Sequence, residues 1–158
     1  MGGRICYGIL RDAPERLKAM IIGGQHTGNI DEIADQVIAS VAHGMDAMLD
    51  HLDGRGIHVP ESQQIRIRAM DPPAVTAMSV RIKNEKDLGS DLTKVTIPCL
   101  LYAGSEDPWL PDVQATAEKI LGCEFKVLEG LDHRQGAERA DLVAPVVTEF
   151  ISRQGQKL

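Results

Sequence analysis

Residues 97–107 read IPCLLYAGSED, and this stretch decides the fold because an apolar run passes directly into a loop of small and acidic residues. Residues 97–103 have the length and apolar character of a buried strand. The pattern recurs at residues 124–128, EFKVL, which precede a loop that ends in His133. Residues 111–121, between the two runs, have the pattern of a helix. Strands separated by helices of this length predict a parallel sheet.

The same alternation extends to both ends of the chain. Residues 2–13 have apolar positions at helical spacing and end before Pro14. The run LKAMII at residues 17–22 closes with two glycines and is typical of a buried parallel strand. Residues 136–151 predict a closing helix. We therefore expect an α/β fold, with a parallel sheet of about three core strands and flanking helices.

The middle of the chain differs in character. Residues 25–95 contain stripes of apolar residues at helical spacing and no strand pattern. Within them, Asp71 and Pro72 predict a helix start, with Asp71 as the cap and Pro72 at the first helical position. A chain of 158 residues is long enough for one core and an insertion. We expect residues 1–24 and 96–158 to form the core and residues 25–95 to form an inserted helical cap.

Composition excludes several classes of protein. The chain is 43% hydrophobic and 25% charged, as ordinary globular proteins are, and its net charge of −6 leaves no basic footprint for nucleic acid. No apolar run approaches the roughly 20 residues that span a bilayer, and the N-terminus lacks the pattern of a signal peptide. Cys6, Cys99 and Cys123 are odd in number and widely spaced, which is typical of reduced structural thiols. We expect a cytoplasmic protein with no membrane or nucleic-acid partner.

Two side chains that carry chemistry follow the two predicted strands. Asp107 lies in the loop after residues 97–103, and His133 lies in the loop after residues 124–128. Because the carboxyl ends of parallel strands meet at one sheet edge, an acid and a histidine are expected to meet there. A general base and its orienting carboxylate have this arrangement. Glu106, which is next to Asp107, is the reserve for the acid.

A second group of polar residues lies in the middle block. His43, Asp46 and Asp50 share one helical face, with His51 nearby, and these are residue types that ligate metals. No second ligand cluster at a recognised spacing accompanies them. We interpret them as a solvated helix face and predict no metal site and no cofactor.

Two stretches of this chain resemble the α/β-hydrolase fold family, whose chain order is nucleophile, acid, histidine. One is AGSED at residues 103–107 together with the loop that ends at His133. The other is MGGRICYGILRDAPERLKAMIIGG, which resembles the family segment directly after the nucleophile in a G-x-S-M-G-G elbow. The resemblance covers nearly the whole chain. It implies that Asp107 orients the imidazole, that His133 is the general base, and that Met1 stands at the oxyanion-donor position. Asp132 stands where the family more often has glycine.

The resemblance implies part of a serine hydrolase that cleaves an ester or related acyl bond of a small-molecule acyl substrate. The serine would stand one residue before Met1, so we expect the nucleophile to be absent and the truncated chain to be inactive without a complementing N-terminal half. The alternative is a stand-alone, non-catalytic binding or interaction module. The strand at residues 17–22 lacks the neighbour that precedes it in the family, and we therefore expect a homo-oligomer, such as a dimer, through the exposed strand edge.

Overall fold

The computed structural model describes residues 2–84, 88–89 and 91–155. Its contacts divide the chain into two compact units. The core unit comprises Met1–Gly28 and Asp87–Leu158, and the helical unit comprises Asn29–Lys86. Within the described residues, no helix combines the length and apolar character that crossing a lipid bilayer requires.

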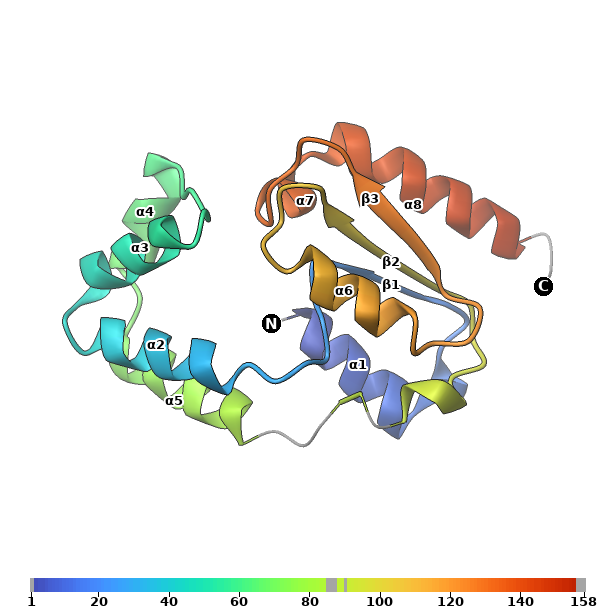
Figure 1. The fold of residues 1–158 in the computed structure, drawn as a ribbon, viewed down its shortest axis with the longest axis horizontal. Coiled ribbons are helices and arrows are strands. Elements are labelled where there is room, and N and C mark those ends of the chain that lie inside the picture. Colours follow the sequence, from blue (N-terminus) through green and yellow to red (C-terminus); the bar gives the residue numbers. More distant parts are fainter. Residues whose placement is uncertain (1, 85–87, 90, 156–158) are drawn as a thin grey trace. The chain divides into compact units, whose positions relative to one another are not determined.

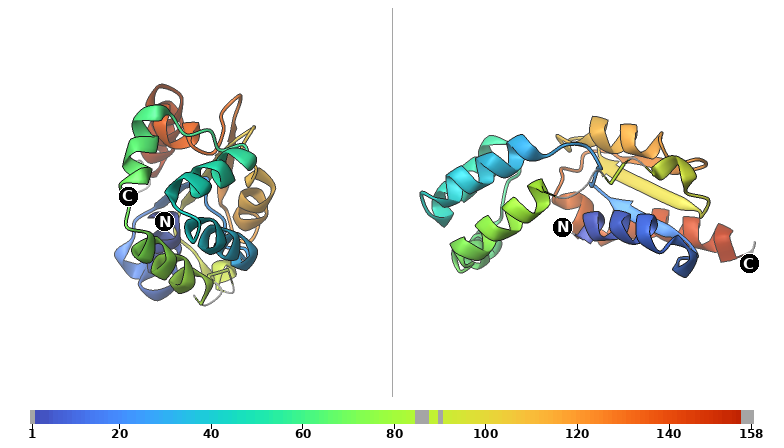
Figure 2. Two further views of the ribbon diagram at one scale, coloured as in Figure 1. Left: turned by 90° about the vertical axis from the view of Figure 1, so that its left-hand side faces the viewer. Right: turned by 90° about the horizontal axis from the view of Figure 1, so that it is seen from below.

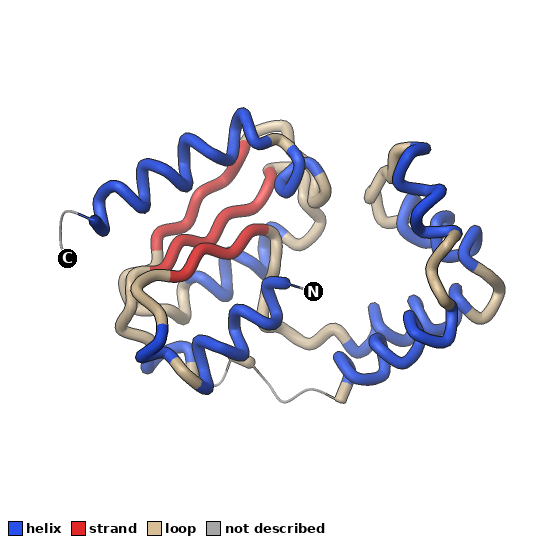
Figure 3. The backbone as a smooth tube through the Cα atoms, turned by 180° about the vertical axis from the view of Figure 1, so that it is seen from behind, coloured by secondary structure: helices blue, strands red, loops and turns tan. Residues whose placement is uncertain are grey.

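The core unit is built on a three-stranded parallel sheet, as the sequence predicts (Figure 3). Its order is β1 (Met20–Gly23), β2 (Cys99–Gly104) and β3 (Glu124–Leu128). β2 is central and β1 lies at one edge of the described sheet. β1 begins later than predicted. Residues 14–16 form a 3₁₀ turn that ends at Leu17, and pairing with the chain of β2 begins only at Met20.

Three helices cover the two faces of the sheet (Figure 1). α1 (Gly2–Asp12) and α6 (Leu110–Ala117) lie on one side, and α8 (Ala140–Gly155) lies on the other. Alternate β2 residues point to opposite faces. Leu101 and Ala103 join the buried cluster that includes side chains of α1 and α6, whereas Leu100 is equally buried but outside that cluster.

The helices at the C-terminal side depart from the prediction. The single helix expected at residues 136–151 is wrong: α7 (Gln135–Glu138) and α8 are separate helices. Arg139 separates them because its ψ of 69° lies far from the helical value, and its carbonyl accepts bonds from the first turn of α8. α6 also ends earlier than residue 121, since the bonds of Lys119 and Ile120 reach back only three residues.

The helical unit contains α2 (Asp31–Val41), α3 (Met45–Gly54), α4 (Glu61–Arg68) and α5 (Pro72–Lys83), and its described residues form no strand. α2 and α5 run side by side (Figure 2). Val41, Met45 and Val75 form the buried cluster of this unit. α5 begins at Pro72 as predicted, but the expected side-chain cap is wrong, because Asp71 makes no capping hydrogen bond.

Candidate functional site

Asp107 and His133 meet at the carboxyl end of the sheet. Nδ1 of His133 lies 2.9 Å from Oδ2 of Asp107. An ionised carboxylate only accepts, so the imidazole donates from Nδ1 and its Nε2 is left as the basic nitrogen. The Asp107 side chain is 1% exposed and that of His133 is 31% exposed. The pair therefore joins a buried acid to a partly accessible base.

The two loops that carry this pair are tied to each other directly beyond the strands. In the register of β2 and β3, Gly104 pairs with Leu128, and the Ser105 N–H donates to the Leu128 carbonyl at 3.0 Å. The Glu106 N–H donates to the Leu131 carbonyl at 3.0 Å. A Cβ at Gly104 would lie 1.9 Å from that carbonyl oxygen, so a side chain there would separate the loops. Parallel pairing thus continues past the sheet and sets the separation of acid and base.

Residues on both sides of His133 hold its backbone. The Gln135 N–H donates to Oδ1 of Asp132 at 2.6 Å, and the Asp132 N–H donates to Oε1 of Gln135 at 3.0 Å. The two bonds are reciprocal and close the turn over residues 132–135 that leads into α7. Asp132, where the resemblance led us to expect glycine, therefore makes specific contacts that fix the turn around the base.

Sequence reasoning missed Gly24 as part of the site. Gly24 follows β1 and has φ of +62°, a conformation that side chains disfavour. A Cβ at this position would lie 3.1 Å from Nδ1 of His133 and 3.3 Å from Oδ2 of Asp107. The paired glycines after residues 17–22 were the available signal, but they indicated only the end of a strand.

Trp109 contacts both members of the pair. Its backbone N–H donates to Oδ1 of Asp107 at 2.9 Å, and its indole packs against the His133 imidazole at 4.2 Å between ring centroids, with the ring planes at 86°. The position of Trp109, two residues after Asp107, was visible in the sequence. Its ring contact depends on the return of the chain after β3, which no local pattern shows.

His26 adds a second, buried histidine beside this group. The ring centroids of His26 and Trp109 lie 6.4 Å apart, and His26 is 4% exposed. Nδ1 of His26 accepts a hydrogen bond from the Gly28 N–H at 3.1 Å. Burial lowers the pKa of His26, against an opposing contribution from Asp112, so the neutral ring is favoured. The hydroxyl of Tyr7 anchors the same loop by donating to the Gln25 carbonyl at 2.9 Å.

The other predicted site residues lie elsewhere. Glu106 is exposed, and within the described part of the chain no hydrogen bond or ion pair joins it to His133. Met1 lies outside the described residues. No described serine, threonine or cysteine is hydrogen-bonded to His133. Burial raises the pKa of Cys99 to about 12 and that of Cys123 to about 11, so both remain protonated thiols at neutral pH.

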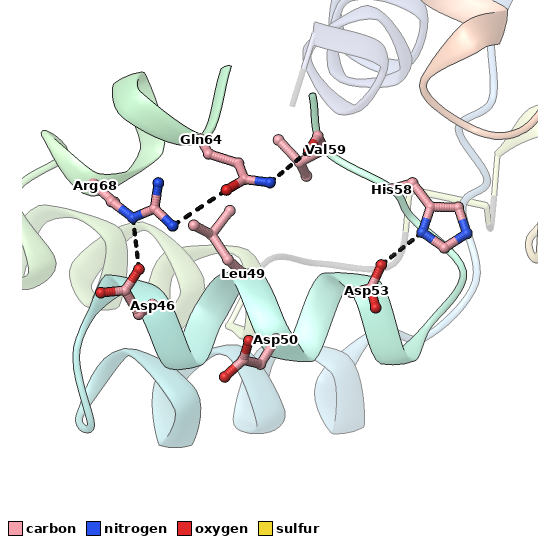
Figure 4. A pocket seen from close by; sticks show the side chains of 8 residues that line it. All are labelled: Asp46, Leu49, Asp50, Asp53, His58, Val59, Gln64 and Arg68. Atoms are coloured by element: carbon pink, nitrogen blue, oxygen red, sulfur yellow. Dashed lines mark hydrogen bonds and ion pairs between the residues drawn. The ribbon is translucent and has the colours of Figure 1, made fainter. Parts of the chain in front are cut away.

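A pocket within the helical unit brings together some of the polar residues noted in the sequence (Figure 4). Asp46 and Asp50 line it, but His43 and His51 do not. Nε of Arg68 donates to Asp46 at 2.6 Å, and Nδ1 of His58 lies 2.6 Å from Asp53. Among the described residues, no group of three or more histidine, cysteine or acidic side chains has an arrangement suited to a metal ion.

Comparison with known proteins identifies the fold. No family model and no curated protein match the sequence. The structure is similar to a thermophilic esterase from Thermogutta terrifontis (TM-score 0.79, 19% identity), covering 97% of this chain and 62% of that one. It is similar to a carboxylesterase structure from Nitrososphaera gargenis (0.78, 18%), covering 99% and 64%. It is also similar to the enol-lactonase from Burkholderia xenovorans (0.74, 18%), covering 96% and 63%. The chain thus spans less than two thirds of each of these proteins.

Proposed function

Because this chain has part of the α/β-hydrolase fold, we propose that it is the acid-and-base portion of a serine hydrolase that cleaves ester or related acyl bonds. The observation that carries the proposal is the 2.9 Å contact between Nδ1 of His133 and Oδ2 of Asp107, at the carboxyl end of two adjacent parallel strands. Open parallel sheets place their reactive groups at this edge.

In this proposal His133 is the general base. Its Nε2 takes the proton from a serine hydroxyl as that oxygen attacks the acyl carbon, and it then gives the proton to the leaving group. Asp107 holds the Nδ1–H tautomer and stabilises the imidazolium that forms after proton transfer. The low exposure of Asp107 strengthens that stabilisation, because little water screens the carboxylate.

We propose that the nucleophile is supplied from outside the described residues, among which no hydroxyl or thiol group is hydrogen-bonded to His133. Proximity of a serine to the base is a large part of catalysis by such a triad. The described residues alone are therefore a poor catalyst in this proposal, although the acid and base are in place.

The edge of β1 is the proposed route for assembly. In the described sheet β1 pairs with β2 only, so one side of β1 has backbone groups without a strand partner. Such an edge pairs readily with another strand. We propose that it accepts a strand from a complementing segment or, without one, from a second copy of this chain.

The test is hydrolysis of short-chain p-nitrophenyl esters by two proteins: the 158-residue chain, and the same chain preceded by whatever sequence its gene encodes directly upstream. Activity is expected in the longer protein only, with His133→Ala and Asp107→Asn each abolishing it. Glu106→Gln is the matched control, because it alters the adjacent but exposed acid, and it should leave activity intact.

Two results would contradict the proposal. One is activity in the longer protein that survives His133→Ala. The other is a longer protein that contains a G-x-S motif and folds, but neither hydrolyses esters nor reacts with a fluorophosphonate reagent. The second result would favour the non-catalytic binding module instead.

A further inference from the structure

We propose that Trp109 is a positioning residue that fixes the imidazole of His133 in the orientation required of the base. The inference rests on the proposed function for its purpose, but its geometry stands on contacts within the core unit. Trp109 touches both residues of the pair, the acid through its backbone and the base through its ring.

The backbone contact selects the oxygen that His133 uses. The Trp109 N–H donates to Oδ1 of Asp107 at 2.9 Å, and His133 is bonded to Oδ2. With Oδ1 engaged by a fixed donor, the carboxylate cannot rotate about its Cβ–Cγ bond without breaking that hydrogen bond. The acceptor for Nδ1 is thereby held in one place.

The ring contact restricts the base itself. The His133 side chain is nearly one third exposed, so burial alone does not fix its rotamer. The indole packs against it at a ring-plane angle of 86°, an edge-to-face geometry that aromatic pairs prefer. Rotation of the imidazole about Cβ–Cγ would break this contact together with the bond to Asp107. Gly24 lies beside the Cε1–Nδ1 edge of the ring, where an added Cβ would come within 3.1 Å of both atoms.

Trp109 itself is held by the core. It is a partly buried side chain packed against the main buried cluster, and its residue directly precedes α6. Its ring therefore packs with the core of this unit, whereas His133 lies in the short turn that leads into α7. A core-packed ring beside a side chain on a turn is the arrangement expected of a positioning contact.

The experiment uses the whole chain with ¹⁵N-labelled histidine. The readouts are the tautomer of His133 and the solvent-exchange rate of its Nδ1–H, with the signal assigned by its loss in His133→Gln. In the unaltered chain we expect the Nδ1–H tautomer. Trp109→Leu, which keeps apolar bulk, should speed exchange about two- to tenfold, the range that corresponds to the free energy of an aromatic pair. Trp109→Phe should restore slow exchange.

Phe125→Leu is the matched control, because Phe125 is another partly buried aromatic side chain packed on the same cluster. It should leave the His133 exchange rate unchanged, which separates loss of core packing from loss of the ring contact. Unchanged exchange in Trp109→Leu, or equal acceleration in Phe125→Leu, overturns the role of Trp109. If the unaltered chain lacks the Nδ1–H tautomer, the acid–base pair fails and the proposed function fails with it.

Discussion

The substitution Gly24→Ala probes the packing around the acid–base pair. Gly24 combines two constraints: φ of +62°, and a position where a Cβ would lie 3.1 Å from Nδ1 and Cε1 of His133. Gly122 has only the first constraint, with φ of +73° and no atom within 4 Å of an added Cβ. The two alanine variants therefore differ in the contacts that the added Cβ makes with His133 and Asp107.

The backbone cost is common to both variants. A left-handed conformation costs a side-chain residue about 1–2 kcal/mol, so Gly122→Ala should lower the free energy of unfolding by that amount. In Gly24→Ala the imidazole must also move by a few tenths of an ångström, which weakens its bond to Asp107. Loss of a hydrogen bond to a charged group costs about 1.5–3 kcal/mol, and partial loss should add about 1–2 kcal/mol to the backbone cost.

Urea unfolding of both variants and of the unaltered chain measures these free energies, and the ¹⁵N spectrum of His133 reports the tautomer. We expect Gly24→Ala to be the less stable variant and the one in which the Nδ1–H signal is weakened. Equal stability of the two variants, with an unchanged His133 signal in both, would refute the inference that Gly24 is glycine to make room for the imidazole.

Three further predictions concern other contacts. The pKa of His26 is lowered from 6.5 in the folded chain, so the unfolded chain binds the proton first as pH falls through that value. The free energy of unfolding should therefore fall by up to about 1.4 kcal/mol per pH unit until the folded ring is protonated. His26→Gln should remove this dependence, as measured by urea unfolding at neutral and mildly acidic pH. Asp132→Ala removes the hydrogen bond from the Gln135 N–H, so it should cost about 0.5–1.5 kcal/mol of unfolding free energy and speed Nδ1–H exchange at His133; unchanged exchange would show that this bond does not hold the base. Solution scattering should reveal self-association through the β1 edge, and a compact monomer at every concentration would contradict it.

The sheet was predictable because its signals are local. The apolar run of β2 ends at Gly104, and that of β3 lies between Glu124 and Glu129. The residues between the two runs have helical spacing. The errors fall where local pattern is ambiguous. Arginine is a residue type that helices accept, so the ψ of 69° at Arg139 could not be inferred from residue type. Periodicity shows an apolar face but does not show such a break.

The proximity of Asp107 and His133 was predictable for a different reason. Asp107 and His133 each follow a strand, and parallel pairing brings such positions together. Gly24, His26 and Trp109 were not identified, because their roles depend on contacts between loops that are distant in sequence. A glycine after a strand has many structural explanations, and only the position of the imidazole distinguishes this one.

Stability alone does not account for burying this pair. Removing a carboxylate and an imidazole from water costs free energy that their mutual attraction need not recover, and apolar residues of similar size often serve a fold as well or better. Asp107 is nevertheless almost fully buried, and one of its oxygens is occupied by the Trp109 N–H while the other faces the base. These contacts leave Nε2 as the nitrogen able to accept a proton, on a side chain that remains partly exposed. That combination supports an acid–base role over a purely structural one, and all of the contacts that maintain it lie within the core unit.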